Sequence, residues 1–141
     1  MQLRQLTDTL SVSGQIDEAD VELLAAQGFR SLINNRPDRE AIGQPASAAI
    51  AALAERHGMT YRYLPVISGQ LQDAQVEAFT QALSTLPTPT LAYCRSGTRS
   101  TMLWALGAAR SRPLEDVLQA AARAGYDLDA LRPRLQEAAA H

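Results

Sequence analysis

The sequence predicts an α/β fold in which a central, mostly parallel sheet of four to five strands is flanked by helices and followed by a helical C-terminal region. Short apolar runs alternate with segments of helical period as far as residue 93, which is the pattern of parallel strands joined by right-handed crossovers. Beyond that point every segment has helical periodicity. A chain of 141 residues, 46% hydrophobic and 20% charged, suits one globular domain spanning residues 1–141.

The predicted strands are short, apolar and bounded by turn-forming residues. Leu10–Ser13 alternates apolar and polar residues, as a half-buried edge strand does, and Arg30–Asn34 has the composition of a buried strand. Thr60–Val66 is rich in β-favouring residues, and Pro65 near its end indicates an edge strand or a strand terminus. Thr90–Tyr93 is apolar and lies between two helices, which predicts a central strand covered on both faces.

The predicted helices begin at capping residues and end at glycine or proline. Asp17 caps the first helix, which Gly28 stops, and the second covers Pro45–Arg56. Asp73 caps a third helix, which ends at the prolines of the segment 86–89. Three more helices are expected in the last third of the chain, over Arg99–Arg110, Pro113–Arg123 and Asp127 to about Ala140.

Composition excludes several classes of protein and site. A formal net charge of −2 argues against nucleic-acid binding through a bulk positive field, and no run is long and apolar enough to cross a membrane. With one cysteine and no basic, apolar leader, the cytoplasm is the expected location. His57 and His141 lie at a helix end and at the chain terminus, so neither a metal site nor a cofactor is expected.

The loop after the last predicted strand, residues 94–99, carries the chemistry. Cys94 leaves the tip of the strand, Ser96 and Gly97 are small enough for the backbone to curl around one centre, and a helix follows at once. Arg95 and Arg99 add two positive charges. Helix amino termini and neighbouring cations favour the thiolate form of cysteine, so this pattern predicts that Cys94 is a nucleophile. The alternative is that Cys94 is a small buried hydrophobe, as many lone cysteines are.

The spacing within this loop resembles that of single-domain rhodaneses, which carry sulfur as a cysteine persulfide. Four residues separate Cys94 from Arg99, whereas cysteine phosphatases have five. Three segments, 13–16, 32–38 and 91–106, are similar to a bacterial family with a fold like that of dual-specificity phosphatases, described as sulfurtransferases or phosphatase-like proteins. Its members occur alone or fused to persulfide dioxygenase or sulfide:quinone oxidoreductase domains. The resemblance therefore implies a cysteine-phosphatase-like fold.

Two departures from phosphatases weaken the prediction of phosphate ester cleavage. Tyr93 stands where their histidine usually precedes the cysteine, and the loop 66–70 has no aspartate where their general acid usually lies. Asp73 could substitute for that acid, although its place before a helix favours capping. A general acid contributes about 10²- to 10⁴-fold in rate, and sulfur transfer does not need one of that strength.

The sequence therefore favours a sulfurtransferase in which Cys94 takes sulfur from thiosulfate or a related small anionic donor and passes it to a thiol such as glutathione. Cys94 and Arg99 would carry the reaction, while the rest of the loop binds the anion through Arg95, Ser96, Gly97, Thr98 and Ser100. Ser100 either hydrogen-bonds the thiolate or packs. A persulfide dioxygenase or a sulfide:quinone oxidoreductase is the expected functional partner. The second interpretation is a phosphatase acting through a phosphocysteine, and the third is an inert anion-binding or docking module.

Several residues outside the loop can also be placed. Asn34, Asn35 and Arg36 follow a neighbouring strand and form either a second wall of the site or a plain turn. The larger aromatic residues are expected to pack in or near the core: Tyr61, Tyr63 and Trp104. Solvated helical faces are expected for the remaining C-terminal arginines: Arg110, Arg112, Arg123, Arg132 and Arg134.

Overall fold

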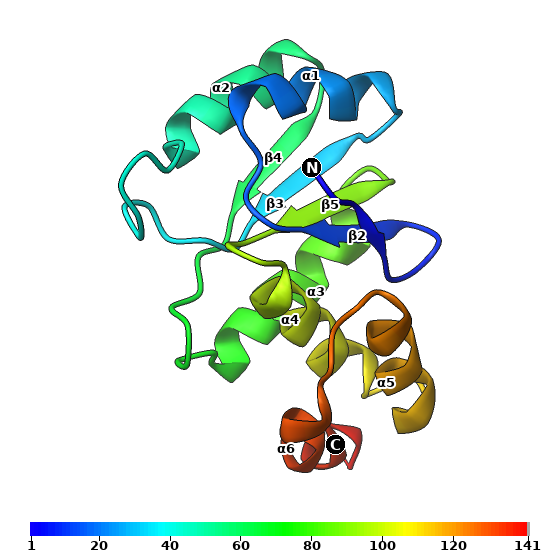
Figure 1. Cartoon of the computed structure of the whole chain (residues 1–141). Helices are drawn as coiled ribbons and strands as arrows, with labels where there is room; N and C mark the ends of the chain where they lie inside the picture. The colour runs from blue at the N-terminus through cyan, green and yellow to red at the C-terminus, as the bar shows by residue number, and fades with distance from the viewer. Residues whose placement is uncertain (141) are drawn as a thin grey trace.

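The structure, a computed structural model, describes residues 1–140 and contains one five-stranded sheet in the order β1-β2-β5-β3-β4. All neighbours pair in parallel except β1 and β2, which pair antiparallel. The strands are β1 (Arg4–Gln5), β2 (Leu10–Ser13), β3 (Ser31–Asn34), β4 (Thr60–Tyr63) and β5 (Thr90–Tyr93). The predicted fold class is confirmed: a mostly parallel sheet flanked by helices, with β5 at its centre (Figure 1).

Helices cover both faces of the sheet. The face bearing Leu32, Leu91 and Tyr93 packs against α1 (Glu18–Ala26) and α2 (Ser47–Arg56). The face bearing Val12, Ile33 and Ala92 packs against the remaining helices, which occupy the lower half of Figure 1. These are α3 (Asp73–Thr85), α4 (Thr98–Ala108), α5 (Leu114–Arg123), the short 3-10 helix η1 (Asp129–Leu131) and α6 (Arg132–Ala139). Within residues 1–140 no helix is both long and apolar enough to cross a bilayer.

The strand predictions were right in position and wrong in two details. Leu10–Ser13 is not an edge strand, because β1, which the sequence did not reveal, pairs with its outer side. The strand predicted over Thr60–Val66 ends at Tyr63, since Pro65 has no N–H to donate to a ladder. β4 is an edge strand, as Pro65 indicated. Leu64 and Val66 still donate their N–H groups to the carbonyls of Asn34 and Asn35, so the segment stays against the end of β3.

The helix predictions differ mainly at the ends. Asp17 caps α1 as predicted, and its carboxylate accepts the N–H of Asp20 at 3.0 Å. Asp73 is not a cap: Gln72 occupies the N-cap position of α3 and Asp73 is the first helical residue. The last helix is shorter than predicted, because the chain first forms η1 and then starts α6 with Pro133 in its first turn.

Candidate active site

Cys94 lies at the carboxyl end of β5, where a parallel sheet presents its ligand site. Its backbone N–H donates to the carbonyl of Ser13 at 3.4 Å, which fixes the start of the loop against β2. The chain then turns through Gly97, whose φ of +91° precedes the first residue of α4. The turn aims the Gly97 N–H at the Cys94 sulfur, with a distance of 3.1 Å. This is the predicted strand-to-helix turn, with the sulfur at its centre.

Two glycines make this turn possible. A Cβ at position 97 would lie 2.1 Å from the hydroxyl oxygen of Tyr126, and the positive φ disfavours any other residue. A Cβ at position 14 would lie 2.9 Å from the carbonyl oxygen of Arg95. That carbonyl also accepts the N–H of Gln15 at 3.3 Å. The segment after β2 therefore presses directly on the Cys94 loop, and only a residue without a side chain fits at position 14.

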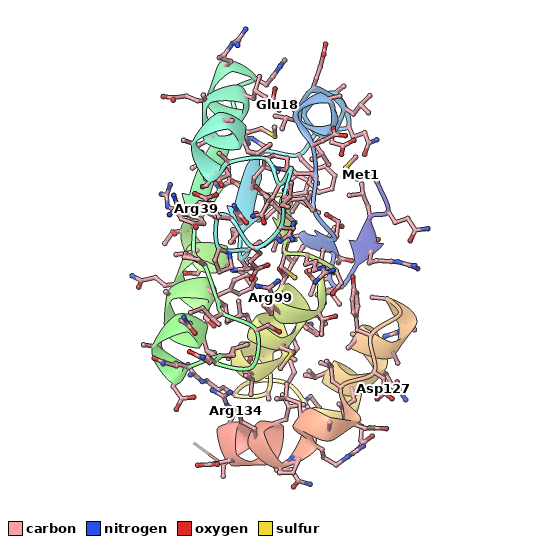
Figure 2. All side chains as sticks on the ribbon, turned by 60° about the vertical axis from the view of Figure 1, so that its left-hand side comes forward. Met1, Glu18, Arg39, Arg99, Asp127 and Arg134 are labelled. Atoms are coloured by element: carbon pink, nitrogen blue, oxygen red, sulfur yellow. The ribbon has the colours of Figure 1, made fainter. Side chains whose placement is uncertain are left out.

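Arg99 reaches back from the first turn of α4 into the interior of the molecule (Figure 2). Its side chain is only 10% exposed. One terminal nitrogen donates to the carbonyl of Val66 at 2.8 Å, which ties the guanidinium to the segment after β4. The pKa of Arg99 is raised above its usual value, chiefly by its hydrogen bonds to Glu40 and also by the nearby Cys94 sulfur. The structure thus brings the two central residues of the predicted site, Cys94 and Arg99, together.

Glu40 joins two arginines of the site. Its carboxylate accepts hydrogen bonds from both terminal nitrogens of Arg99, at 2.7 and 2.9 Å, and from Nε of Arg36, at 2.8 Å. These bonds, led by those from Arg99, lower the pKa of Glu40 below its usual value. Glu40 is therefore an ionised hydrogen-bond acceptor at neutral pH, and it compensates one of the two positive charges that it touches.

Of Asn34, Asn35 and Arg36, expected to form either a second wall of the site or a plain turn, two bond to residues around the Cys94 loop and one supports the turn. Asn35 and Arg36 reach the site through Ser100 and Glu40, respectively. Asn34 instead supports the turn: its amide donates to the Tyr61 hydroxyl at 3.0 Å, and its side-chain oxygen accepts the N–H of Arg36 at 2.8 Å.

The structure selects one of the two roles considered for Ser100 and corrects the expectation for Asp73. The buried Ser100 hydroxyl donates to Oδ1 of Asn35 at 2.7 Å, so it ties α4 to the segment after β3 and is not bonded to the sulfur. Asp73 neither caps its helix nor faces Cys94, because its 92% exposed side chain pairs with Arg134 at 3.0 Å. Its side chain therefore lies outside the loop that holds the sulfur.

The sulfur itself is fully buried, and the surface beside it is hollow. A cavity of about 260 Å³ adjoins the Cys94 loop. It is lined by Arg95, Ser96, Thr98 and Arg99 from the loop, Met102 from α4, Arg134 from α6, and Ser68, Gly69 and Leu71 from the segment before α3. The cavity thus gathers three guanidinium groups beside the loop, and no Asp or Glu is in its lining.

Three residues near the site were not predicted. The Tyr126 hydroxyl donates to the Ser96 carbonyl at 2.9 Å, and the pKa of Tyr126 is raised by burial and, secondarily, by the charge of Cys94. Arg134, expected on a solvated face, lines the cavity and donates to the Leu71 carbonyl at 2.8 Å. For Glu40 the sequence contained one indication of an ion pair, its position four residues after Arg36. Tyr126 and Arg134 arrive by tertiary packing of the C-terminal helices, which has no local signature.

The described residues place no obvious proton donor at the sulfur. Glu40 is held ionised between two arginines, and Asp73 lies at the surface. In residues 1–140 no group of three His, Cys, Asp or Glu side chains is placed to hold a metal ion. The Gly97 N–H and the Arg99 guanidinium beside the sulfur are suited to stabilise a thiolate and an anionic donor.

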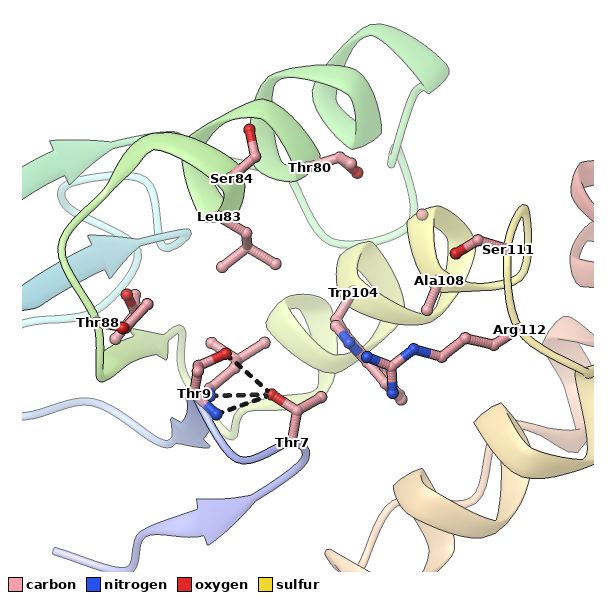
Figure 3. A pocket seen from close by; sticks show the side chains of 13 residues that line it. Thr7, Thr9, Thr80, Leu83, Ser84, Thr88, Trp104, Ala108, Ser111 and Arg112 are labelled. Carbon is pink, nitrogen blue, oxygen red and sulfur yellow. Dashed lines mark hydrogen bonds between the residues drawn. The ribbon is translucent and has the colours of Figure 1, made fainter.

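A further cavity, of about 280 Å³, lies at the opposite end of the sheet (Figure 3). It is lined by Leu10 and Thr90, the first residues of β2 and β5, whereas Cys94 follows the other end of β5. The lining is mostly hydroxyl and apolar groups, and Arg112 is its one charged residue. The Thr7 hydroxyl is occupied by the N–H groups of Thr9 and Leu10. This cavity is separate from the site around Cys94.

Comparison with known proteins identifies the family of the chain. Residues 2–111 match the family model for the phosphatase-like domain of beta-lactamase hydrolase-like protein. The chain is 37% identical over 130 residues to the beta-lactamase hydrolase-like protein of Xylella fastidiosa Temecula1 and 35% identical to that of Agrobacterium fabrum. Each alignment covers 91% of this chain but only 30% of the relative, so the chain spans less than a third of their length.

Solved structures extend the likeness to nearly the whole chain. A protein of Neisseria meningitidis Z2491 described as a "putative phosphatase" superimposes with a TM-score of 0.87 at 38% identity, covering 98% of this chain and 99% of its own. The active form of Tk-PTP superimposes with a TM-score of 0.76 at 14% identity, covering 99% of this chain and 97% of its own, and so shares the fold. The cysteine-phosphatase-like fold expected from the resemblance is thereby confirmed. The chain belongs to the family of the phosphatase-like domain of beta-lactamase hydrolase-like proteins.

Proposed function

We propose that the chain is an enzyme in which Cys94 takes a group from an anionic donor and passes it to an acceptor. The observation that carries this proposal is the sulfur at the carboxyl end of β5, bonded by the Gly97 N–H at 3.1 Å and close enough to Arg99 to raise the pKa of that guanidinium. A thiolate is stabilised by such donors, and so is an anionic group attached to it. The remaining question is which group Cys94 accepts.

Phosphate monoester hydrolysis is the interpretation that the comparisons support better, because the related proteins are described as phosphatases or phosphatase-like. In this reaction the thiolate attacks phosphorus, the ester P–O bond breaks, and water then hydrolyses the phosphocysteine. The lining of the cavity beside the loop contains no Asp, Glu or His to protonate the leaving oxygen, so this oxygen would depart as an anion or take its proton from water. We therefore expect activity on aryl phosphates, whose phenol leaving groups have a pKa of about 10, and far less on alkyl phosphates.

Sulfur transfer is the second candidate, and two observations of the site favour it. The loop has four residues between Cys94 and Arg99, and the carboxylate nearest the arginines, Glu40, is ionised. The thiolate would attack the outer sulfur of thiosulfate, the S–S bond would break, and sulfite would leave without needing a proton. A thiolate acceptor such as glutathione would then take the outer sulfur of the persulfide and regenerate the Cys94 thiolate. A persulfide dioxygenase or a sulfide:quinone oxidoreductase would be the partner in that case.

One pair of assays tests the proposal and separates the candidates. Wild type and Cys94→Ser are compared for thiosulfate turnover with cyanide or glutathione, and for hydrolysis of 4-nitrophenyl phosphate. Activity on either donor that is lost in Cys94→Ser supports covalent transfer and names the group. Equal rates in the two proteins on both donors would exclude Cys94 as the carrier.

Arg99→Lys supplies a second test of the same site. Lysine keeps the charge but loses the planar fork that holds Glu40 and the Val66 carbonyl. We expect kcat/KM on the accepted donor to fall about 100-fold, the order found when one donor to a developing charge is removed. A change of less than about threefold would remove Arg99 from the mechanism.

A further inference from the structure

We propose that the cavity beside the Cys94 loop holds a second anionic group of the substrate, at a subsite formed by Arg95 and Arg134. This inference rests on the proposed function, because it concerns a substrate whose other end reacts at Cys94. It assigns a substrate class: small molecules with a reacting group at one end and a carboxylate or sulfonate at the other. The argument depends on how the three guanidinium groups that line the cavity are occupied.

Arg99 is held in place by three hydrogen bonds to protein groups. Its terminal nitrogens donate to both oxygens of Glu40 and to the Val66 carbonyl. Glu40 is also shared with Arg36. The charge of this cluster faces the sulfur and is partly compensated, so Arg99 is suited to the reacting group and not to a second one.

Arg95 is free within the described part of the chain. Its side chain is exposed, lines the cavity, and makes no hydrogen bond or ion pair with another of residues 1–140. No acidic side chain compensates its charge from within the cavity, since the lining contains no Asp or Glu. An exposed arginine without a partner, directly after the candidate nucleophile, is available to a bound anion.

Arg134 is held in place while keeping donors to spare. It donates to the Leu71 carbonyl at 2.8 Å and to Asp73 at 3.0 Å, and its side chain is 35% exposed. A guanidinium has five N–H donors, so these two bonds orient the group and leave others for a ligand. Figure 2 shows Arg134 on α6 and Arg99 on α4. Arg134 belongs to α6, so the C-terminal helices supply this wall of the cavity.

The remaining residues of the lining indicate which chemistry would suit the middle of the ligand. Leu71 and Met102 are apolar, and Ser68, Ser96 and Thr98 offer hydroxyl groups. The volume of about 260 Å³ is near the lower end, about 300 Å³, of small-molecule pockets. The cavity therefore fits a short, partly apolar linker between the reacting atom and the second anion, as in a mercaptocarboxylate or a carboxylated aryl phosphate.

Methanethiosulfonate reagents test the subsite without assuming either enzymatic reaction. The Cys94 thiolate attacks the sulfenyl sulfur of the reagent, a disulfide forms, and methanesulfinate leaves. The 2-sulfonatoethyl reagent carries an anion two carbons from the sulfur, whereas the 2-hydroxyethyl reagent is neutral and of similar length. The ratio of their labelling rates, followed by intact-protein mass, measures the preference for a distal anion, and the neutral reagent controls for folding and access.

We expect the wild type to favour the anionic reagent. Arg134→Gln and Arg95→Gln should each lower the ratio about fivefold, the effect of one charge contact about 4 Å away in a solvated site. Asp73→Asn should raise the ratio, because it removes the acid that competes for Arg134. The matched control is Arg132→Gln, which removes one positive charge from the same helix. Arg132 pairs with Glu115 and does not line the cavity. Its ratio should stay at the wild-type value.

The outcomes separate the two proposals. A ratio unchanged in Arg134→Gln and Arg95→Gln, with Cys94 reacting normally, would overturn the subsite and leave the proposed function intact. A wild-type Cys94 that reacts with neither reagent would overturn the proposed function itself. Steady-state assays then show whether the second anion belongs to a sulfur acceptor or to a phosphate donor. 3-Mercaptopropionate is compared with 2-mercaptoethanol as sulfur acceptor, and 4-carboxyphenyl phosphate with phenyl phosphate as donor. Equal kcat/KM within both pairs would also overturn the substrate class.

Discussion

Replacing Glu40 by glutamine isolates the charge that holds the site together. Glutamine has nearly the same shape, so Glu40→Gln removes one negative charge and leaves Arg36 and Arg99 in place. Their side chains are only 6% and 10% exposed, and Glu40 accepts three hydrogen bonds from them. Removing one partner of a fully buried pair costs about 3–5 kcal/mol. The Glu40 side chain is 24% exposed, so we expect a smaller loss, about 2 kcal/mol, in the free energy of unfolding at neutral pH.

The pH dependence of the free energy of unfolding tests the role of the Glu40 charge independently. The pKa of Glu40 is lowered in the folded protein, mainly by hydrogen bonds from Arg99, so its charge stabilises the fold fully above its unfolded value of 4.5. That stabilisation is lost as the pH falls from 4.5 through the lower folded pKa. The wild type should therefore lose its advantage over Glu40→Gln in this acidic window.

Urea unfolding followed by circular dichroism, at neutral pH and at pH values below about 4.5, measures both effects. Glu77→Gln is the matched control, because Glu77 is 65% exposed and pairs with Arg110 at the surface. Its loss should be about 0–1 kcal/mol. Equal losses in the two variants at neutral pH, or a difference between wild type and Glu40→Gln that does not shrink in acid, would refute the assignment of Glu40 as the counter-charge of both arginines.

Three further substitutions test the packing around the loop. Gly97→Ala should lower the free energy of unfolding in urea by more than about 2 kcal/mol, because its Cβ would lie 2.1 Å from the Tyr126 hydroxyl at a φ of +91°. A near-neutral change would contradict the positive φ and the close contact with Tyr126 at this turn. Ser100→Ala leaves Oδ1 of Asn35 without its donor and should lower the free energy of unfolding by about 1–3 kcal/mol. The control Ser84→Ala, at the surface, should lower it by about 0.5 kcal/mol or less. Equal losses would argue against the bond between α4 and the segment after β3. Tyr93→Phe removes a buried hydroxyl that has no partner among residues 1–140 and should leave thermal stability unchanged or raise it by about 1 kcal/mol, while a marked loss would reveal a bond that the structure lacks.

Local patterns in the sequence were sufficient to predict most of the fold. The alternation of apolar runs and helical segments identified four of the five strands, and the central place of β5 followed from its apolar residues between two helices. β1 was missed because Arg4–Gln5 is a polar pair with no strand pattern. β1 forms because the free edge of β2 has unpaired N–H and C=O groups, with which Arg4 and Gln5 pair in antiparallel register.

The centre of the site was predictable for the same reason, since Cys94, Gly97 and Arg99 are neighbours in one loop. Partners from distant segments were not. Glu40 follows β3, whereas Tyr126 and Arg134 come from the C-terminal helical region, and only tertiary packing sets them beside the loop. Ser100 shows the limit from the other side. Its place next to the loop suggested the sulfur as one possible partner, but its hydroxyl donates to Asn35 at 2.7 Å.

Trapping the group on Cys94 tests the central claim most directly. The protein is mixed separately with thiosulfate and with 4-nitrophenyl phosphate, quenched in acid, and examined by intact-protein and peptide mass spectrometry. The account predicts that one donor leaves either a sulfur atom or a phosphoryl group on the peptide containing Cys94, and that Cys94→Ser gains neither. A donor consumed by the wild type while Cys94 stays unmodified, with the same consumption in Cys94→Ser, would contradict it.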